Sequence, residues 1–466
     1  MNMRKKSPHK ILLCAILIPI GILFLVYLGF AFYFSSHFFY HTTINGIDVS
    51  VKKVAEAEDL LSKKISKYIL ELNGREDLQD FIYAEDVKLT FVSNGEVSTY
   101  LSEQNPLLWF LSIWNQTDKE LGKCVSLDDD LLDETLHSLV FFQKENITKP
   151  KNAYIDYVKD QGYTLVPEIL GTTLDQDLLY EHVREAILSG NTKLSLEDFY
   201  KNPKITATTE KLVNLYEKVS LYSGSKITYN FGKKSEVVDH SVIKDWLIIN
   251  KKKYSVKIDS TKTREFVDYI GRTYNTFGST RTFKGSNGHT ISVSGGDYGW
   301  LLNREKETKD LMKLVKKGKS TTRKPAYTQS AVTHDKQDWG NTYVEVNLSV
   351  QHLWFYKNGK LIVDSDFVSG NIGRGNGTHT GVYGVTYKTR DAILGENSGA
   401  DYRSPVSFWM PFNGNEGMHD ASWRSKFGGS IYKTNGSHGC VNLPYSAAQK
   451  IYNNIEAGVA VVVFYE

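Results

Sequence analysis

Cysteine is scarce in this chain, which has three in 466 residues: Cys14, Cys124 and Cys440. So few cysteines exclude a disulfide-rich scaffold. Charge of one sign is scarce as well, because the formal net charge is +3, and no basic stripe with interleaved aromatic residues occurs. The composition therefore gives no reason to expect nucleic acid as a partner. With 41% hydrophobic and 23% charged residues, a chain of this length predicts roughly two to four domains with buried cores.

A long uncharged hydrophobic run lies near the N-terminus, at residues 11–34. At about 1.5 Å per residue it can cross the ~30 Å hydrocarbon layer of a membrane as one helix. Lysine and arginine residues precede it, which favours a cytoplasmic tail at 1–10 and export of the chain after residue 34. A cleaved signal peptide is the alternative, but the run is long and no small-x-small site follows it. We therefore predict an uncleaved transmembrane anchor.

The middle of the chain contains an internal repeat with an offset of 128 residues. Four glycines mark this offset, because Gly171 aligns with Gly299 and Gly190 aligns with Gly318. Each copy is typical of a strand, a tight glycine turn and a helix closed by a glycine just after its end. The segments that begin at Val125 and Val256 are also alike after a further shift of three residues. The repeat predicts two structurally related modules.

The boundaries of these modules follow from the repeat and from changes in composition. We predict α+β modules at 35–215 and 216–337. A polar segment at 319–341, without apolar periodicity, is predicted to be the linker to the last domain. The first module opens with a short extended piece and a helix. Three apolar residues share one face of this helix, namely Val54, Ala57 and Leu61.

The last part of the chain, 338–466, changes to alternating strand patterns with a hairpin turn at Asn358-Gly359. A helix is expected directly after Cys440, with Pro444 near its first turn. Residues 459–466 are apolar and predict a final buried strand. The C-terminal domain is therefore predicted to be mostly β.

A glycine turn in front of this helix holds Cys440. A thiol becomes a nucleophile when its proton is removed, and a helix N-terminus just after the cysteine would favour the thiolate. Backbone amides near Gly439 would bind the oxyanion of a tetrahedral intermediate. The alternative for two exported cysteines is a structural disulfide between Cys124 and Cys440.

A cysteine nucleophile also needs a base, for which His419 and His438 are candidates. We prefer His419, because it comes from a separate segment and can approach the sulfur from the side. His438 would then be a supporting or substrate-side residue. Ser437, or a backbone carbonyl beside it, is the acceptor expected to orient the imidazole. Asn442 would hold the turn as a helix N-cap or contact substrate.

The histidine and cysteine motifs together resemble a known family. His419, followed after a gap by Ser437-His438-Gly439-Cys440-Val441-Asn442, resembles the H-x(n)-[ST]-H-G-C-x-N signature of L,D-transpeptidases with a YkuD-type catalytic domain. The resemblance covers about residues 340–466 and includes a segment similar to the family's opening hairpin, with Gln351. The two modules resemble the peptidoglycan-binding modules of Gram-positive enzymes of the enterococcal type.

This resemblance implies a multidomain membrane-anchored cysteine acyltransferase whose catalytic domain faces the cell wall. Cys440 would attack the carbonyl between the third residue and D-Ala of a peptidoglycan stem tetrapeptide, releasing D-Ala and forming a thioester. An amine on a neighbouring stem would then attack, giving a 3→3 cross-link, with His419 moving the protons. The resemblance also implies acylation by carbapenems and neither a cofactor nor a metal. Its expected partners are stem peptides, the cell wall and the membrane.

Three other interpretations stay open at the level of sequence. A zinc-dependent peptidoglycan hydrolase would use His419, His438 and Cys440 as ligands, although no HExxH motif occurs. A serine enzyme of the penicillin-binding type would need the S-x-x-K string at Ser50, which lies in a different module from the other matching strings. A non-catalytic wall-binding scaffold would use only the repeated modules.

Overall fold

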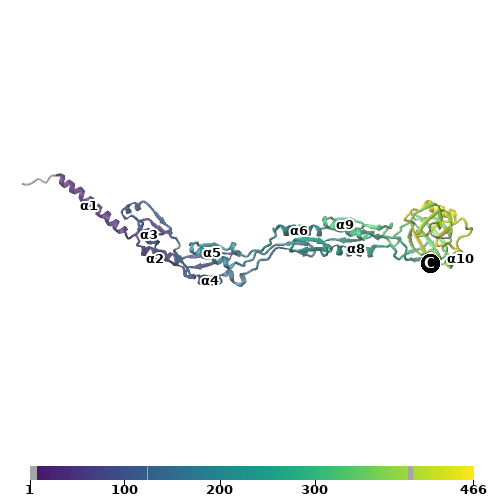
Figure 1. Ribbon diagram of the computed structural model, residues 1–466, viewed down its shortest axis with the longest axis horizontal. Helices are drawn as coiled ribbons and strands as arrows, with labels where there is room; N and C mark the ends of the chain where they lie inside the picture. Colours follow the sequence, from purple (N-terminus) through teal and green to yellow (C-terminus); the bar gives the residue numbers. More distant parts are fainter. Residues whose placement is uncertain (1–7, 123, 397–401) are drawn as a thin grey trace, which may run out of the picture. The chain divides into compact units, whose positions relative to one another are not determined.

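The computed structural model of the chain describes residues 8–122, 124–396 and 402–466, with the side chains of the first helix described at residue 13 and from residue 15 onward. Figure 1 follows the described chain from α1 near the N-terminus to the C-terminal domain. Its residues fall into two structural units. Unit 1 holds residues 1–154 and 166–207, and unit 2 holds 155–165 and 208–466. The boundary differs from the predicted one, because a hairpin of the first module belongs to unit 2. This hairpin consists of β8 (Tyr154–Val158) and β9 (Gly162–Val166).

Unit 1 begins with α1 (Pro8–Phe34), in which Ala15–Phe34 is long and apolar enough to cross a membrane. A small α+β part with its own core follows, which the predicted first module did not separate. Its helix α2 (Val54–Ile65) confirms the predicted amphipathic helix, because Ala57 and Leu61 are buried. The other elements are β1 (Thr42–Ile44), β2 (Ile47–Asp48), β5 (Thr90–Phe91), α3 (Glu96–Ser102), the 3₁₀ helix η2 (Pro106–Ile113), β6 (Thr117–Lys119) and β7 (Val125–Ser126).

The two repeated modules share one topology. In each, two strands form a hairpin, and a third strand, which follows a helix, pairs in parallel with the first strand of that hairpin. The first module contains β3 (Ile69–Asn73), β4 (Gln79–Tyr83), α4 (Asp129–Ser138), α5 (Gln176–Leu188) and β10 (Lys193–Ser195). The second contains β11 (Ile227–Phe231), β12 (Lys234–Val238), α8 (Ser260–Tyr274), α9 (Arg304–Lys316) and β18 (Thr321–Arg323). The predicted repeat is therefore present in three dimensions.

Helix caps explain why both copies fold alike. Asp128 and Asp259 are the N-caps of α4 and α8, and each side chain accepts a hydrogen bond from a backbone amide of the first turn. Gly190 and Gly318 follow the ends of α5 and α9 with φ of +71° and +63°. A positive φ favours glycine, so each glycine can end its helix without strain.

Further short elements complete the second module. They are α6 (Glu210–Ser223), α7 (His240–Ile243), β13 (Leu247–Asn250), β14 (Ser255–Ile258), β15 (Arg281–Lys284), β16 (Thr290–Val293) and β17 (Leu301–Leu302). The hairpin of β15 and β16 packs on the C-terminal domain, where Phe283 and Val293 share a core with Val382, Val462 and Phe464.

The prediction that residues 319–341 form an unstructured polar linker is wrong, because two strands lie within them. Within it, β18 pairs with β11, and β19 (Tyr327–Gln329) pairs with β17. Asp338 is 1% exposed, and its carboxylate accepts a hydrogen bond of 2.9 Å from the buried Arg281 guanidinium. Strands of three residues are too short to show an alternating pattern, and a buried ion pair resembles a surface one in sequence.

The Arg281–Asp338 pair gives a testable prediction for stability. Asp338→Ala should lower the free energy of unfolding by about 3–5 kcal/mol, because the guanidinium would stay buried without its partner. Urea unfolding followed by circular dichroism measures the loss. As a matched control, Glu305→Ala removes an exposed ion pair with Lys309 on α9 and should cost less than about 1 kcal/mol. Equal losses in the two variants would contradict this role of Asp338.

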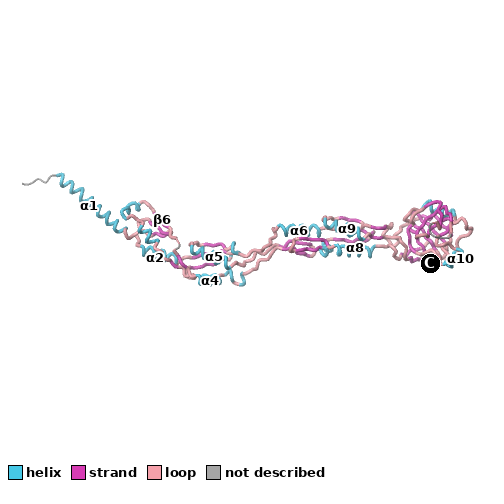
Figure 2. Tube along the Cα trace, viewed as in Figure 1, coloured by secondary structure: helices cyan, strands magenta, loops and turns pink. Residues whose placement is uncertain are grey.

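The C-terminal domain is mostly β, as predicted (Figure 2). Its five-stranded sheet has the order β22-β21-β20-β28-β23, and its four-stranded sheet the order β24-β25-β26-β27. The first is made of β20 (Tyr343–Asn347), β21 (His352–Lys357), β22 (Lys360–Asp366), β23 (Gly381–Gly384) and β28 (Ala460–Phe464). The second is made of β24 (Thr389–Leu394), β25 (Ser404–Asn413), β26 (Glu416–Asp420) and β27 (Val441–Leu443). Residues of both sheets and of α11 (Tyr445–Asn454) form one apolar core.

Two local predictions for this domain are confirmed, and one is wrong. Asn358 and Gly359 form the β21–β22 turn with φ of +51° and +77°, and β28 is buried throughout. The helix does not begin directly after Cys440, because β27 comes first and α11 begins at Tyr445. Cys440 therefore lies at the start of a strand.

Candidate active site

Cys440 lies where a glycine turn enters β27, and its side chain is 9% exposed. Gly439 has a φ of +123°, and a Cβ at this position would lie 2.9 Å from Glu416 Oε1. Only glycine fits such a turn without moving the carboxylate. The Cys440 thiol donates to the backbone carbonyl of Asn415 at 3.4 Å. The turn therefore holds the sulfur against the edge of β26.

Strand pairing brings His419 to the cysteine. β26 and β27 are parallel neighbours, with His419 opposite Asn442 in the ladder. The imidazole and the thiol line the same cavity of about 190 Å³. His419 Nδ1 lies 2.9 Å from the backbone carbonyl of Asp420. Only a protonated Nδ1 can donate to that oxygen, so the lone pair of a neutral ring is on Nε2.

Burial sets the protonation of both groups. It raises the pKa of the Cys440 thiol to about 12, an effect that the Gly417 backbone amide opposes. It also lowers the pKa of His419 to about 4. Both charged forms are disfavoured because a buried charge loses its hydration. The resting pair is therefore a neutral thiol and a neutral imidazole. The prediction that a helix N-terminus next to Cys440 stabilises its thiolate is wrong, because β27 separates Cys440 from α11.

The pH dependence of acylation follows from this neutral pair. His419 can accept a proton only when its ring is uncharged, and its lowered pKa keeps it uncharged until the pH falls to about 4. The rate of acylation by a carbapenem should therefore persist in mild acid and fall as the pH drops through about 4. Stopped-flow fluorescence over a pH series measures this rate. A fall centred near the ordinary histidine value of 6.5 would contradict a buried neutral base.

Ser437 holds the turn instead of orienting the imidazole. Its hydroxyl donates to the Cys440 carbonyl at 2.6 Å and accepts from the Gly439 amide at 3.1 Å. The carbonyl that His419 Nδ1 contacts belongs to Asp420, so the structure gives the orienting role to a different backbone oxygen. The Asp420 side chain points elsewhere and accepts from the backbone amides of Ser407 and Phe408.

The structure places His438 and Asn442 beside the same cavity. The His438 ring stacks on Tyr402, with centroids 4.5 Å apart, which suits a position on the substrate side. Asn442 lies in β27 and its backbone bonds to Val368. It does not cap the helix, because Pro444 is at that position. Within the described residues its buried Oδ1 has no hydrogen-bond partner, which leaves this acceptor for a ligand.

Three aromatic residues of the site were not predicted from the sequence. Trp409 and Trp423 flank His419, with ring centroids 5.9 and 6.0 Å from the imidazole. Tyr402 lies against His438. They come from different segments and carry no motif of their own, so only the fold brings them together. Among the residues that the structure describes, those of this site included, no three His, Cys, Asp or Glu side chains are grouped to hold a metal ion.

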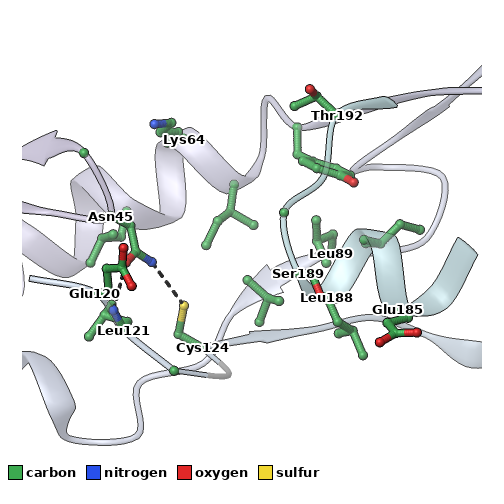
Figure 3. Close-up of a pocket in the computed structure, with 18 of the residues that line it drawn as sticks. Asn45, Lys64, Leu89, Glu120, Leu121, Cys124, Glu185, Leu188, Ser189 and Thr192 are labelled. Carbon is green, nitrogen blue, oxygen red and sulfur yellow. Dashed lines mark hydrogen bonds between the residues drawn. The ribbon is translucent and has the colours of Figure 1, made fainter. Parts of the chain in front are cut away.

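A larger hollow, of about 1290 Å³, lies in unit 1 between α2 and the end of α5 (Figure 3). Cys124 lines it, with Asn45 Nδ2 4.0 Å from its sulfur. Burial raises the pKa of the Cys124 thiol, which makes it a poor nucleophile. Cys124 and Cys440 are both free, so the structure contradicts the disulfide alternative.

A buried cysteine and a neutral histidine line one cavity, which is the arrangement that general-base activation of a thiol requires. The family described as "L,D-transpeptidase catalytic domain" (YkuD) matches residues 341–463. A second family, "Putative peptidoglycan binding domain", matches 84–195 and 205–323. No curated protein matches the chain.

Solved structures from Enterococcus faecium are similar to this chain. The crystal structure of a cysteine-to-serine mutant of its L,D-transpeptidase has 34% sequence identity, covers 55% of this chain and 100% of that chain, and gives a TM-score of 0.47. The NMR structure of its catalytic domain acylated by ertapenem has 42% identity, covers 27% of this chain and 97% of that chain, and gives a TM-score of 0.25.

The chain belongs to the L,D-transpeptidase family and has a YkuD catalytic domain at its C-terminus. It is thus a peptidoglycan transpeptidase, an acyltransferase with two matches to peptidoglycan-binding domains ahead of its catalytic domain. The family predicted from the histidine and cysteine motifs is confirmed.

Proposed function

We propose that the protein forms 3→3 cross-links in peptidoglycan through a thioester on Cys440. The observation that carries this proposal is the meeting of the Cys440 thiol and the His419 imidazole, both uncharged, in one cavity. A neutral imidazole can take the thiol proton as the sulfur attacks, so the buried pair needs no separated charges at rest.

The first half of the reaction removes D-Ala from the donor. The Cys440 sulfur bonds to the carbonyl carbon that precedes D-Ala, and His419 Nε2 receives the thiol proton. When the tetrahedral intermediate collapses, the carbon–nitrogen bond breaks and His419 returns the proton to the leaving amine of D-Ala. The products are free D-Ala and a thioester.

The second half transfers the acyl group. An amine on the third residue of a neighbouring stem attacks the thioester carbonyl, its proton passes to His419, and the sulfur leaves and is protonated again. The Gly439 amide donates to Ser437, so we assign oxyanion stabilisation chiefly to the Cys440 amide. Asn442 Oδ1 and the His438 ring would contact the substrate, since Oδ1 has no hydrogen-bond partner among the described residues and both residues line the cavity.

The rest of the chain places this chemistry at the cell wall. α1 would anchor the protein in the membrane, with the tail at 1–10 in the cytoplasm and the remainder outside. The uncharged length of Ala15–Phe34 supports this anchor. The two modules would hold the enzyme on peptidoglycan, as the description of the family that they match suggests. Carbapenems would acylate Cys440, since an Enterococcus faecium relative has been solved as an ertapenem adduct.

Mass spectrometry of the reaction products tests the proposal. Full-length protein in detergent, incubated with a stem tetrapeptide, should release D-Ala and form a cross-linked dimer. Treatment with iodoacetamide should abolish both products, whereas a chelator should leave them unchanged. Loss of activity with the chelator alone would favour the zinc hydrolase instead. Neither product under any condition would favour a wall-binding scaffold.

A further inference from the structure

A second apolar surface lies beside the outer end of α1. It consists of η2 (Pro106–Ile113) and Trp114, called here the 106–114 segment. Six large apolar side chains of this segment are exposed: Leu107, Leu108, Phe110, Leu111, Ile113 and Trp114. No charged residue occurs between Glu103 and Asp118. A contiguous apolar patch with a polar rim marks an interaction site, in contrast to scattered single residues.

The segment packs directly on the apolar helix. The Tyr27 hydroxyl donates to the Leu107 carbonyl. The Trp109 ring lies 4.7 Å from that of Phe30 and 6.0 Å from that of Phe34, between centroids. Tyr27 is about 10 Å before the end of the helix at a rise of 1.5 Å per residue. The segment therefore runs along the last two turns of the span and makes one continuous apolar surface with it.

Polar contacts fix the segment in this place. Gln104 accepts from the Phe39 amide at 3.0 Å and donates to the His37 carbonyl at 3.1 Å. His37 and Phe39 follow the span, so these two hydrogen bonds hold the segment beside the end of α1. Within the segment, the Asn105 side chain caps the Leu107 amide, and the Ser112 hydroxyl donates to the Trp109 carbonyl. Inside a membrane no water is available to polar groups, so such internal hydrogen bonds suit an apolar solvent. Among the described residues the Trp109 Nε1 has no partner.

We propose that the 106–114 segment enters the outer leaflet of the bilayer that α1 spans, so that its occupant is lipid. The inference rests on the proposed membrane anchor, because the exposed side chains continue the surface of that helix. Trp109 and Trp114 suit this depth, since tryptophan is enriched where hydrocarbon meets the headgroups. The segment gives unit 1 a second attachment to the membrane besides α1. This attachment would restrict tilting of the rest of unit 1 about the end of that helix.

Site-specific fluorescence quenching in lipid vesicles tests the inference. The full chain, with its native cysteines replaced, carries one NBD label at Leu108→Cys, Leu23→Cys or Ile248→Cys. Leu23 reports on the span itself, and Ile248 is a matched apolar position, 54% exposed, in the second module. We expect labels at 23 and 108 to lose most of their fluorescence to a lipid-borne nitroxide and to resist iodide. The label at 248 should behave in the opposite way.

The three labels separate failure of the inference from failure of the anchor. Lipid quenching at 23 with iodide quenching at 108 would overturn the inference and leave the anchor standing. Iodide quenching at both positions would overturn the anchor too. A label at 108 shielded from both quenchers would mean that protein, such as a second copy of the chain, covers the segment, which also overturns the inference. Ile113→Cys should repeat the result for 108 if the label itself does not disturb the segment.

Discussion

Replacing Cys440 with alanine is expected to abolish both D-Ala release and dimer formation from a stem tetrapeptide. The substitution removes the sulfur that forms the thioester, and no second thiol lines the cavity. Alanine keeps the Cβ, so the turn beside Gly439 can stay unchanged. Product analysis by mass spectrometry measures the loss, and circular dichroism checks the fold.

Cys124 supplies the matched control for this variant. It is also free and buried, but it belongs to unit 1, whereas the catalytic domain belongs to unit 2. Cys124→Ala should retain transpeptidation and carbapenem acylation. Cross-linked product from Cys440→Ala at the rate of the unaltered protein would refute the proposed nucleophile.

Replacing His419 with glutamine should slow acylation by about 10²–10⁴-fold, the usual contribution of a positioned general base. Glutamine can donate to the Asp420 carbonyl that the imidazole now contacts, but it cannot take the thiol proton. The high pKa of Cys440, about 12, leaves very little thiolate to react without a base. The rate of ertapenem acylation, followed by intact mass, measures the effect.

A variant of His438 distinguishes the general base from a substrate-binding residue in the same assay. Its ring stacks on Tyr402 and lies on the turn itself, so His438→Ala should weaken substrate binding more than it slows the chemical step. A larger loss of the maximal acylation rate in His438→Ala than in His419→Gln would reverse the assignment of the base.

The sequence predicted that His419 and Cys440 lie together, as they do in one cavity, because both residues belong to one recognisable motif. It also predicted the repeated modules, since Gly190 and Gly318 must adopt a positive φ at equivalent helix ends. Both features can be recognised from the order and spacing of residues along the chain, without knowledge of the fold.

What the sequence did not predict depends on contacts between distant segments. Trp409 lies beside His419 because the register of β25 and β26 sets the two residues opposite each other, and Trp423 reaches the imidazole from the turn after β26. The protonation of the pair depends on burial, which no motif reports. The three-residue β27 was missed because Val441-Asn442-Leu443 is too short to show a strand period.

The most direct measurement is the mass of the enzyme trapped with a tetrapeptide donor whose third-residue amine is blocked, so that no acceptor is present. We expect the protein to gain the mass of a tripeptide acyl group and peptide mapping after acid quenching to place this group on Cys440. Hydroxylamine should release the group, as it does from thioesters. An acyl group on any other residue, or turnover of the donor with no covalent intermediate in Cys440 peptides, would contradict the central claim.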